Sequence, residues 1–161
     1  LNFDRGLCGL NAPKAQGVAG FLDRVGTFPL RDLTITSRDP YAAILAVSLD
    51  DQPLASSQSI LVQIGTRALP TGWTTRPSTL KTNGGQQTLE GFQIVETGRM
   101  PWAITSADAS ISVRNPTLNS AVALDANGLP LRSLAVDRQA RALQLDLPPD
   151  ALYVLLRAEA E

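Results

Sequence analysis

The sequence contains no histidine and only one cysteine among its 161 residues. The absence of histidine excludes Ser-His-Asp and Cys-His nucleophilic catalysis, and it excludes any zinc site that needs an imidazole ligand. Cys8 has no second cysteine with which to form an intrachain disulfide, so we expect it to be a small buried apolar residue. We expect neither a metal site nor a cofactor.

Charge and long apolar runs are also scarce. Charged residues make up 18% of the chain and the net charge is −1, which provides no basic field for nucleic acid and no polybasic patch for a membrane surface. No stretch reaches the roughly 18 apolar residues that a transmembrane helix needs. We therefore expect neither a nucleic-acid nor a membrane partner.

Acidic residues are scattered, and they do not form a convincing catalytic pair. A glycosidase needs only two carboxylates flanking the scissile bond, and Glu90 and Glu96 are the nearest candidates. They are expected to be the solvent-facing positions of a strand whose apolar positions include Phe92, Ile94 and Val95. The chain is therefore expected to be non-catalytic.

Two acidic segments are better interpreted as turns than as calcium loops. Asp125-Ala126-Asn127-Gly128 offers only two side-chain oxygen donors, and a calcium loop needs several at alternating positions. Asp50-Asp51 follows an apolar run, and Asp tolerates the left-handed backbone conformation better than most residues.

The residues that are present favour β-structure. Eleven prolines and twelve glycines are spread along the chain and would interrupt any long helix. Leu143, Leu145 and Leu147 alternate with polar residues, as in a half-buried antiparallel strand. Further strands are expected at 17–22, 30–36, 41–49, 60–66, 111–114, 122–124, 129–136 and 152–156.

We predict an all-β fold, an antiparallel β-sandwich with jelly-roll or Ig-like topology, formed by residues 1–161 as a single domain. The strand at 152–156 is expected to be central, with both faces covered, because it is almost wholly apolar. Residues 70–86, rich in Thr, Gly and Pro, are expected to form a long exposed loop. The predicted core residues are Val47, Leu61, Ile64, Val122, Leu145 and Val154.

Four segments, in this order, resemble the C-terminal β-sandwich domain of large bacterial glycoside hydrolases. They are LNAPKAQGVAGF at 10–21, SLDDQPLASSQSILVQIGTR at 48–67, GRMPWAI at 98–104, and VALDANGL at 122–129 followed by LYVLL at 152–156. The chain departs from the family pattern at Ala12, where threonine is usual, and at Trp102, which stands among positions that are usually aliphatic.

The resemblance implies a non-catalytic accessory domain that follows an N-terminal catalytic barrel in the same polypeptide. It implies a secreted bacterial protein, extracellular or periplasmic, from which this chain is a piece. Carbohydrate binding is the first expectation, with polysaccharide or oligosaccharide as ligand. The alternatives are a structural domain that braces the catalytic barrel, and an adhesin-like interaction domain.

Aromatic residues make up only 5% of the chain, which limits where a sugar could stack. Trp73 lies in the polar, Pro- and Gly-rich segment, and Trp102 follows Gly98-Arg99-Met100-Pro101. Tyr41 begins an expected strand. The candidate ligand-binding residues are Trp73, Trp102, Tyr41, Arg76 and Arg99.

Overall fold

The computed structural model describes residue 2 and the ranges 4–139 and 141–159. The regular structure within these ranges is almost entirely β-strand, and contacts between residues divide the chain into two units. One unit comprises Leu1–Thr66 and Ser106–Glu161, and the other is Arg67–Thr105. The interpretation of residues 1–161 as a single domain stays a prediction.

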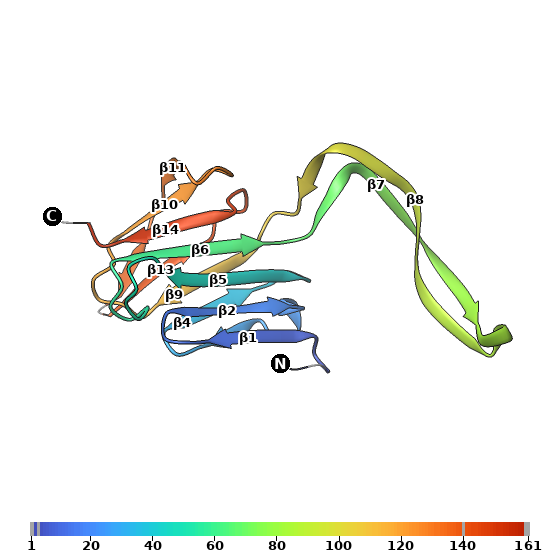
Figure 1. The fold of residues 1–161 in the computed structure, drawn as a ribbon, viewed down its shortest axis with the longest axis horizontal. Coiled ribbons are helices and arrows are strands. Elements are labelled where there is room, and N and C mark those ends of the chain that lie inside the picture. Colours follow the sequence, from blue (N-terminus) through green and yellow to red (C-terminus); the bar gives the residue numbers. More distant parts are fainter. Residues whose placement is uncertain (1, 3, 140, 160–161) are drawn as a thin grey trace. The chain divides into compact units, whose positions relative to one another are not determined.

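The larger unit is an antiparallel β-sandwich, which confirms the predicted fold class (Figure 1). Its seven-stranded sheet has the order β1-β2-β5-β6-β14-β10-β11, and its five-stranded sheet has the order β12-β13-β9-β4-β3. The first sheet consists of β1 (Leu7–Asn11), β2 (Ala15–Gly20), β5 (Ala42–Ser48), β6 (Ser59–Gly65), β10 (Ser120–Leu124), β11 (Pro130–Ser133) and β14 (Tyr153–Arg157). The second consists of β3 (Thr27–Pro29), β4 (Leu33–Ser37), β9 (Ala109–Val113), β12 (Asp137–Gln139) and β13 (Ala142–Asp146), and the short 3-10 helix η1 (Leu22–Arg24) follows β2.

The core lies between the two sheets and follows from the strand alternation. Residues of β13 and β9 at alternate positions, such as Leu143 and Ile111, are buried while their neighbours face outward. The last strand, β14, lies between β6 and β10 and carries Val154 and Leu156 into the core, as expected for a central strand. The largest fully buried apolar side chains are Leu22, Leu33, Ile35, Ile44, Leu54, Ile60, Leu118, Leu143, Leu156, Val62 and Val113.

The predicted core is correct for three residues and wrong for three. Ile64, Leu145 and Val154 are buried. Cys8 was also expected to be buried, but it is exposed because β1 is the edge strand of its sheet. Val47, Leu61 and Val122 are only half-buried, because the inward positions of their strands are the intervening residues: Ala46 of β5, Val62 of β6 and Ala121 of β10, for example.

A buried glutamine links the two sheets. The Gln16 side chain on β2 is fully buried, and its Nε2 donates to Asp32 Oδ2 at 3.0 Å. Its Oε1 accepts from the backbone amides of Asp32 at 2.8 Å and Leu33 at 3.0 Å, where β4 begins. Since a buried polar group is costly unless it is paired, this side chain fixes the seven-stranded sheet against the start of β4.

Both acidic segments form turns, as predicted. Asp51 has φ 63°, the left-handed conformation expected of it. Asp125 Oδ1 accepts from the backbone amides of Asn127 at 2.8 Å and Leu129 at 2.9 Å, and Gly128 has φ 82°. These are the hydrogen bonds of an Asx turn.

The smaller unit is a long β-hairpin, so the predicted loop at 70–86 is wrong. Strand β7 (Ala68–Thr82) pairs antiparallel with β8 (Gln87–Ile104), and the short 3-10 turn η2 (Asn83–Gly85) connects them. Each strand has one unpaired edge, where proline is tolerated because no ladder donor is needed. Pro77 accordingly sits opposite Phe92 within the ladder.

Candidate docking surface

The hairpin forms from residues that favour strands over most of its length. Strands β7 and β8 contain many β-branched and aromatic residues, namely threonine, isoleucine, valine, tryptophan and phenylalanine. These residue types favour β-strands. At the closed end, Gly84 and Gly85 have φ 67° and 93°, which glycine adopts without strain. The strands on either side can therefore pair up to Thr82 and Gln87.

Two irregularities modify the ribbon. The pairing register shifts between Pro70 and Thr71, and again between Thr74 and Thr75. Gly98 lies beside the first shift with φ 67°, and a Cβ there would be 2.6 Å from the Thr71 carbonyl oxygen. Glycine is thus required at position 98, because its backbone approaches the facing strand too closely for any side chain.

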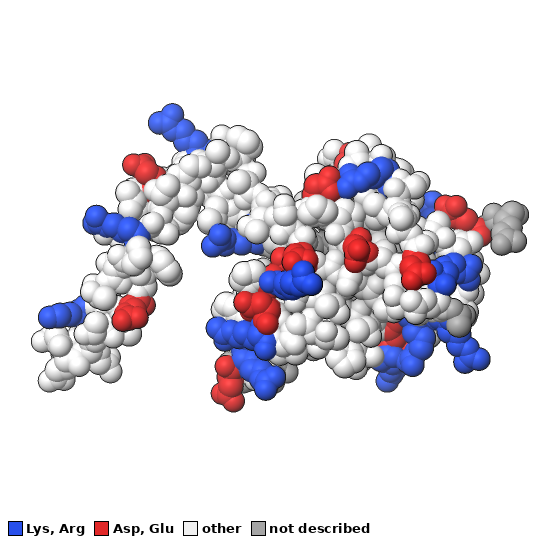
Figure 2. All heavy atoms as spheres, turned by 180° about the vertical axis from the view of Figure 1, so that it is seen from behind, with Lys and Arg blue, Asp and Glu red and all other residues white. Residues whose placement is uncertain are grey.

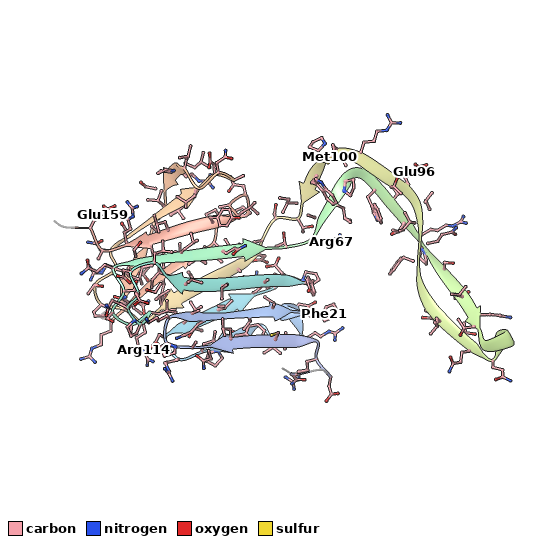
Figure 3. The ribbon with its side chains drawn as sticks, viewed as in Figure 1. Phe21, Arg67, Glu96, Met100, Arg114 and Glu159 are labelled. Carbon is pink, nitrogen blue, oxygen red and sulfur yellow. The ribbon has the colours of Figure 1, made fainter. Side chains whose placement is uncertain are left out.

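The hairpin exposes large apolar side chains, one on β7 and the others along β8. Phe92 is 75% exposed and Met100 is 72% exposed. Such exposure is unusual for side chains of this size, which gain free energy when they leave water. The full set is Leu80, Leu89, Phe92, Ile94, Val95, Met100, Trp102 and Ile104. Figure 3 draws side chains projecting from both strands of the ribbon and labels Met100.

The hairpin also carries an excess of positive charge. It contains four cations and two acids, which gives a net charge of +2. The cations are Arg67, Arg76, Lys81 and Arg99, and the acids are Glu90 and Glu96. Within the described part of the hairpin no ion pair forms; the four ion pairs of the structure join residues outside Arg67–Thr105.

Four of the five predicted ligand-binding residues lie on this hairpin. Trp102 lies opposite Pro70 and is 54% exposed. Trp73 lies opposite Thr97 and is less exposed, being half-buried. Arg99 is exposed, and exposed Arg76 donates to Gln93 Oε1 from Nε at 2.9 Å and from Nη2 at 2.8 Å.

The fifth predicted residue, Tyr41, belongs to the sandwich. It precedes β5, is 55% exposed, and packs edge-to-face on Phe21 with ring centroids 5.5 Å apart. Arg24 lies over the Phe21 ring, with its guanidinium carbon 4.3 Å from the ring centroid. Tyr41 is thus part of a local aromatic contact of the sandwich unit.

Sequence reasoning missed the exposed apolar residues of β8. Phe92, Ile94 and Val95 were expected to be the covered side of a strand whose acids face solvent, but all three are more than half exposed. The sequence contained a signal for this exposure, because the apolar run lies next to a Pro- and Gly-rich segment and no further expected strand could cover it.

A second apolar surface lies on the outward face of the seven-stranded sheet. Five apolar residues are paired in register across five adjacent strands, from β2 to β10: Ala15, Val47, Leu61, Leu155 and Val122. A sheet with one solvated face ordinarily carries polar residues at such positions. This apolar row contains none; four of its members are half-buried, and Leu155 is 8% exposed.

No family model, curated protein or solved structure matches this chain. Within residue 2 and the ranges 4–139 and 141–159, no helix is long and apolar enough to cross a bilayer. In the same ranges, histidine, cysteine and acidic side chains do not gather in any group of three that could hold a metal ion.

Proposed function

We propose that this chain is a non-catalytic accessory module of a carbohydrate-active enzyme, and that its hairpin docks on the folded catalytic domain of the same polypeptide. The observation that carries the proposal is the set of exposed apolar side chains, mostly on β8, in a ribbon whose described residues contribute nothing to the buried core. The resemblance of the four sequence segments to glycoside hydrolase accessory domains supplies the context.

The energetics favour a docked hairpin. A two-stranded ribbon is marginally stable in water unless a third strand or another element packs against it. Burying one side chain such as Phe92 or Leu80 contributes about 1.5–3 kcal/mol relative to leaving it exposed. Contact with a folded surface would therefore stabilise the hairpin and the complex together.

The charges indicate what kind of surface would receive the hairpin. Arg67, Lys81 and Arg99, which form no ion pair with any described residue, would face a polar rim around the apolar contact. Complementary charge raises the rate and specificity of association. The receiving surface should have an apolar floor and an acidic rim.

The apolar row of the seven-stranded sheet also favours a packed module over an isolated one. Val47, Leu61 and Val122 are half-buried in the chain alone, and their outward direction leaves that face available to a neighbouring domain. Bracing of the catalytic domain, with apolar faces covered by it, accounts for both surfaces.

The test compares hydrogen exchange in this chain alone with exchange in the longer polypeptide that carries the catalytic domain. We expect amides of β7 and β8 to exchange fast in the isolated chain and to be protected in the longer one. Replacing Phe92 and Ile94 with serine should remove that protection. Leu49→Ser, at a similarly exposed position of the sandwich, is the matched control and should not.

Equal exchange of the hairpin amides in the two polypeptides would contradict the proposal. A carbohydrate-binding role through Trp102 is the second candidate, favoured by the exposure of its indole. It would appear as a change in tryptophan fluorescence on adding oligosaccharide to the isolated chain, without any effect of the serine variants on interdomain protection.

A further inference from the structure

The outward face of the five-stranded sheet differs in chemistry from that of the seven-stranded sheet. Its central strands β4, β9 and β13 present Thr34, Ser112 and Gln144 in one cross-strand row. A second row, two residues along each strand, comprises Thr36, Ser110 and Asp146. All six residues are polar, and lysine, arginine and glutamate do not occur among them.

The short Ser and Thr side chains of these rows leave the sheet surface uncovered and produce a groove. Three adjoining hollows, of about 460, 570 and 500 Å³, lie along it. The first two share Thr34 and Ser112, and the last two share Thr36 and Ser110. Each hollow is within the size range of small-molecule sites, and the shared residues make the groove continuous along the strands.

The groove contains hydrogen-bonding groups that the protein does not use. Within the described ranges, the side chains of Ser110, Ser112, Thr34 and Gln144 make no hydrogen bond to another protein group. Hydroxyl and amide groups both donate and accept. An incoming ligand can therefore pair with them without displacing an existing protein contact.

The two ends of the groove carry different charges. Arg31, Arg114 and Arg141 line the first hollow around the single carboxylate of Asp32. Arg114 Nη2 donates to Asp32 Oδ1 at 3.2 Å, and the side chains of Arg31 and Arg141 have no partner among the described residues. At the other end Asp146 lies beside the Arg38–Asp108 pair.

Figure 2 shows this side of the sandwich. Positive side chains lie at more than one edge of the sandwich, including the edge at which Figure 3 labels Arg114, and several acidic side chains lie between them.

We infer that this groove binds an oligosaccharide that carries an acidic group, with the acid held by Arg31, Arg114 and Arg141. Guanidinium groups bind carboxylate and sulfate oxygens through paired hydrogen bonds. Sugar hydroxyls, which donate and accept, match the free hydroxyls and amide of the two polar rows. The inference rests on the carbohydrate context of the proposed function.

Other ligand classes fit the groove less well. A peptide that adds as a strand needs a free sheet edge, but the backbones of β4, β9 and β13 are paired on both sides. A uniformly anionic chain would meet Asp146 and Asp137 along its path. The ligand should therefore be mostly neutral, with its acid at the arginine end.

The test is a calorimetric titration of this chain with an aldotetraouronic acid, in which one glucuronate is attached to neutral xylotriose. A sulfated xylotetraose replaces carboxylate by sulfate and identifies which acid is preferred. We expect binding of at least one, with affinity that falls as salt rises, because the arginines are exposed.

Two variants locate the site. Arg31→Gln with Arg141→Gln should weaken binding about tenfold, to the level of neutral xylotetraose. Ser112→Phe, which fills two of the hollows, should abolish it. Arg157→Gln, an exposed arginine on β14 of the other sheet, is the matched control and should bind as the parent chain does.

Several results would overturn the inference: no binding of either acidic oligosaccharide at millimolar concentration, unchanged affinity in the double arginine variant, or binding of inorganic sulfate or tetraglutamate as tight as that of the oligosaccharides. If Ser112→Phe fails to fold, the arginine variants still decide. The titration uses this chain alone, so it is independent of whether the hairpin docks on a catalytic domain.

Discussion

At the scale of single residues, the clearest structural role belongs to Asp50. Its carboxylate accepts from the backbone amide of Gln58 at 2.6 Å and from the hydroxyls of Ser57 and Ser48, each at 2.8 Å. A fourth hydrogen bond comes from the Gln52 amide at 3.3 Å. The hydrogen bond from Gln58, followed by the others, holds the pKa of Asp50 well below its ordinary value near 3.8.

This pKa shift gives stability a defined pH dependence. Because the folded pKa lies below the unfolded one, the contribution of Asp50 is fully present above about pH 4 and is lost as pH falls toward the folded pKa. We expect Asp50→Asn to destabilise the chain at pH 7 and to reduce the loss of stability between pH 7 and pH 3, measured by urea unfolding.

Asp51→Asn is the control for this experiment. Asparagine tolerates the left-handed backbone of position 51, and the four hydrogen bonds of Asp50 stay in place. The Asp51 variant should lose only its exposed ion pair with Lys14, worth about 0–1 kcal/mol, and keep the parent's pH dependence. Identical pH profiles for the Asp50 variant and the parent would contradict the assignment.

Turn chemistry at this scale could be predicted from the sequence. Asp50-Asp51 and Asp125–Gly128 were identified as turns because short polar side chains bond to the backbone within a few residues. Such interactions depend only on neighbours along the chain. The groove residues could not be identified, since Ser112 and Arg141 become neighbours only when β9 and β13 pair.

At the scale of elements, the hairpin is the feature that could not be predicted from the sequence. Its prolines and glycines are typical of a loop, and its strands lack the regular alternation that marks a half-buried sheet. The structure accommodates Pro70 and Pro77 because each strand of a two-stranded ribbon has a free edge. Composition alone cannot distinguish such a ribbon from an exposed loop.

Gly98 provides the element-scale prediction. An added Cβ would meet the Thr71 carbonyl oxygen at 2.6 Å and the Trp73 amide nitrogen at 2.8 Å, and φ there is 67°. Gly98→Ala should therefore destabilise the hairpin by more than the roughly 1 kcal/mol typical of a strained backbone substitution. Faster amide exchange within β7 and β8 of the longer polypeptide, in which we expect these amides to be protected, would report it.

Gly91→Ala is the matched control on the same strand. Nothing lies within 4 Å of a Cβ at position 91, and its φ is not in the left-handed region. Alanine there should be neutral or should stabilise the hairpin by about 0.4–1 kcal/mol. Neither variant should shift the main unfolding transition, because the buried core contains no residue of the hairpin. Equal exchange rates in the two variants would refute the close approach at Gly98.

At the scale of the whole sandwich, the fold class could be predicted from the sequence. Which residues of β5, β6 and β10 point into the core could not. Strand β5 reads AAILAVS, so its outward residues are nearly as apolar as its inward ones. A period of two identifies a buried face only when the other face is polar. The same ambiguity affects β6 and β10, and it arises because the outward face of this sheet is itself apolar.

A pair of alanine variants tests which face is inside. Leu145 on β13 is 5% exposed and points into the core, so Leu145→Ala should cost about 2–5 kcal/mol of unfolding free energy. Leu61 on β6 is half-buried and points outward, so Leu61→Ala should cost about 1 kcal/mol in the isolated chain. Urea unfolding measures both. A larger loss at Leu61 than at Leu145 would reverse the facing of β6. Because the proposed function covers the outward face with another domain, the cost of Leu61→Ala should rise in the longer polypeptide while that of Leu145→Ala stays the same.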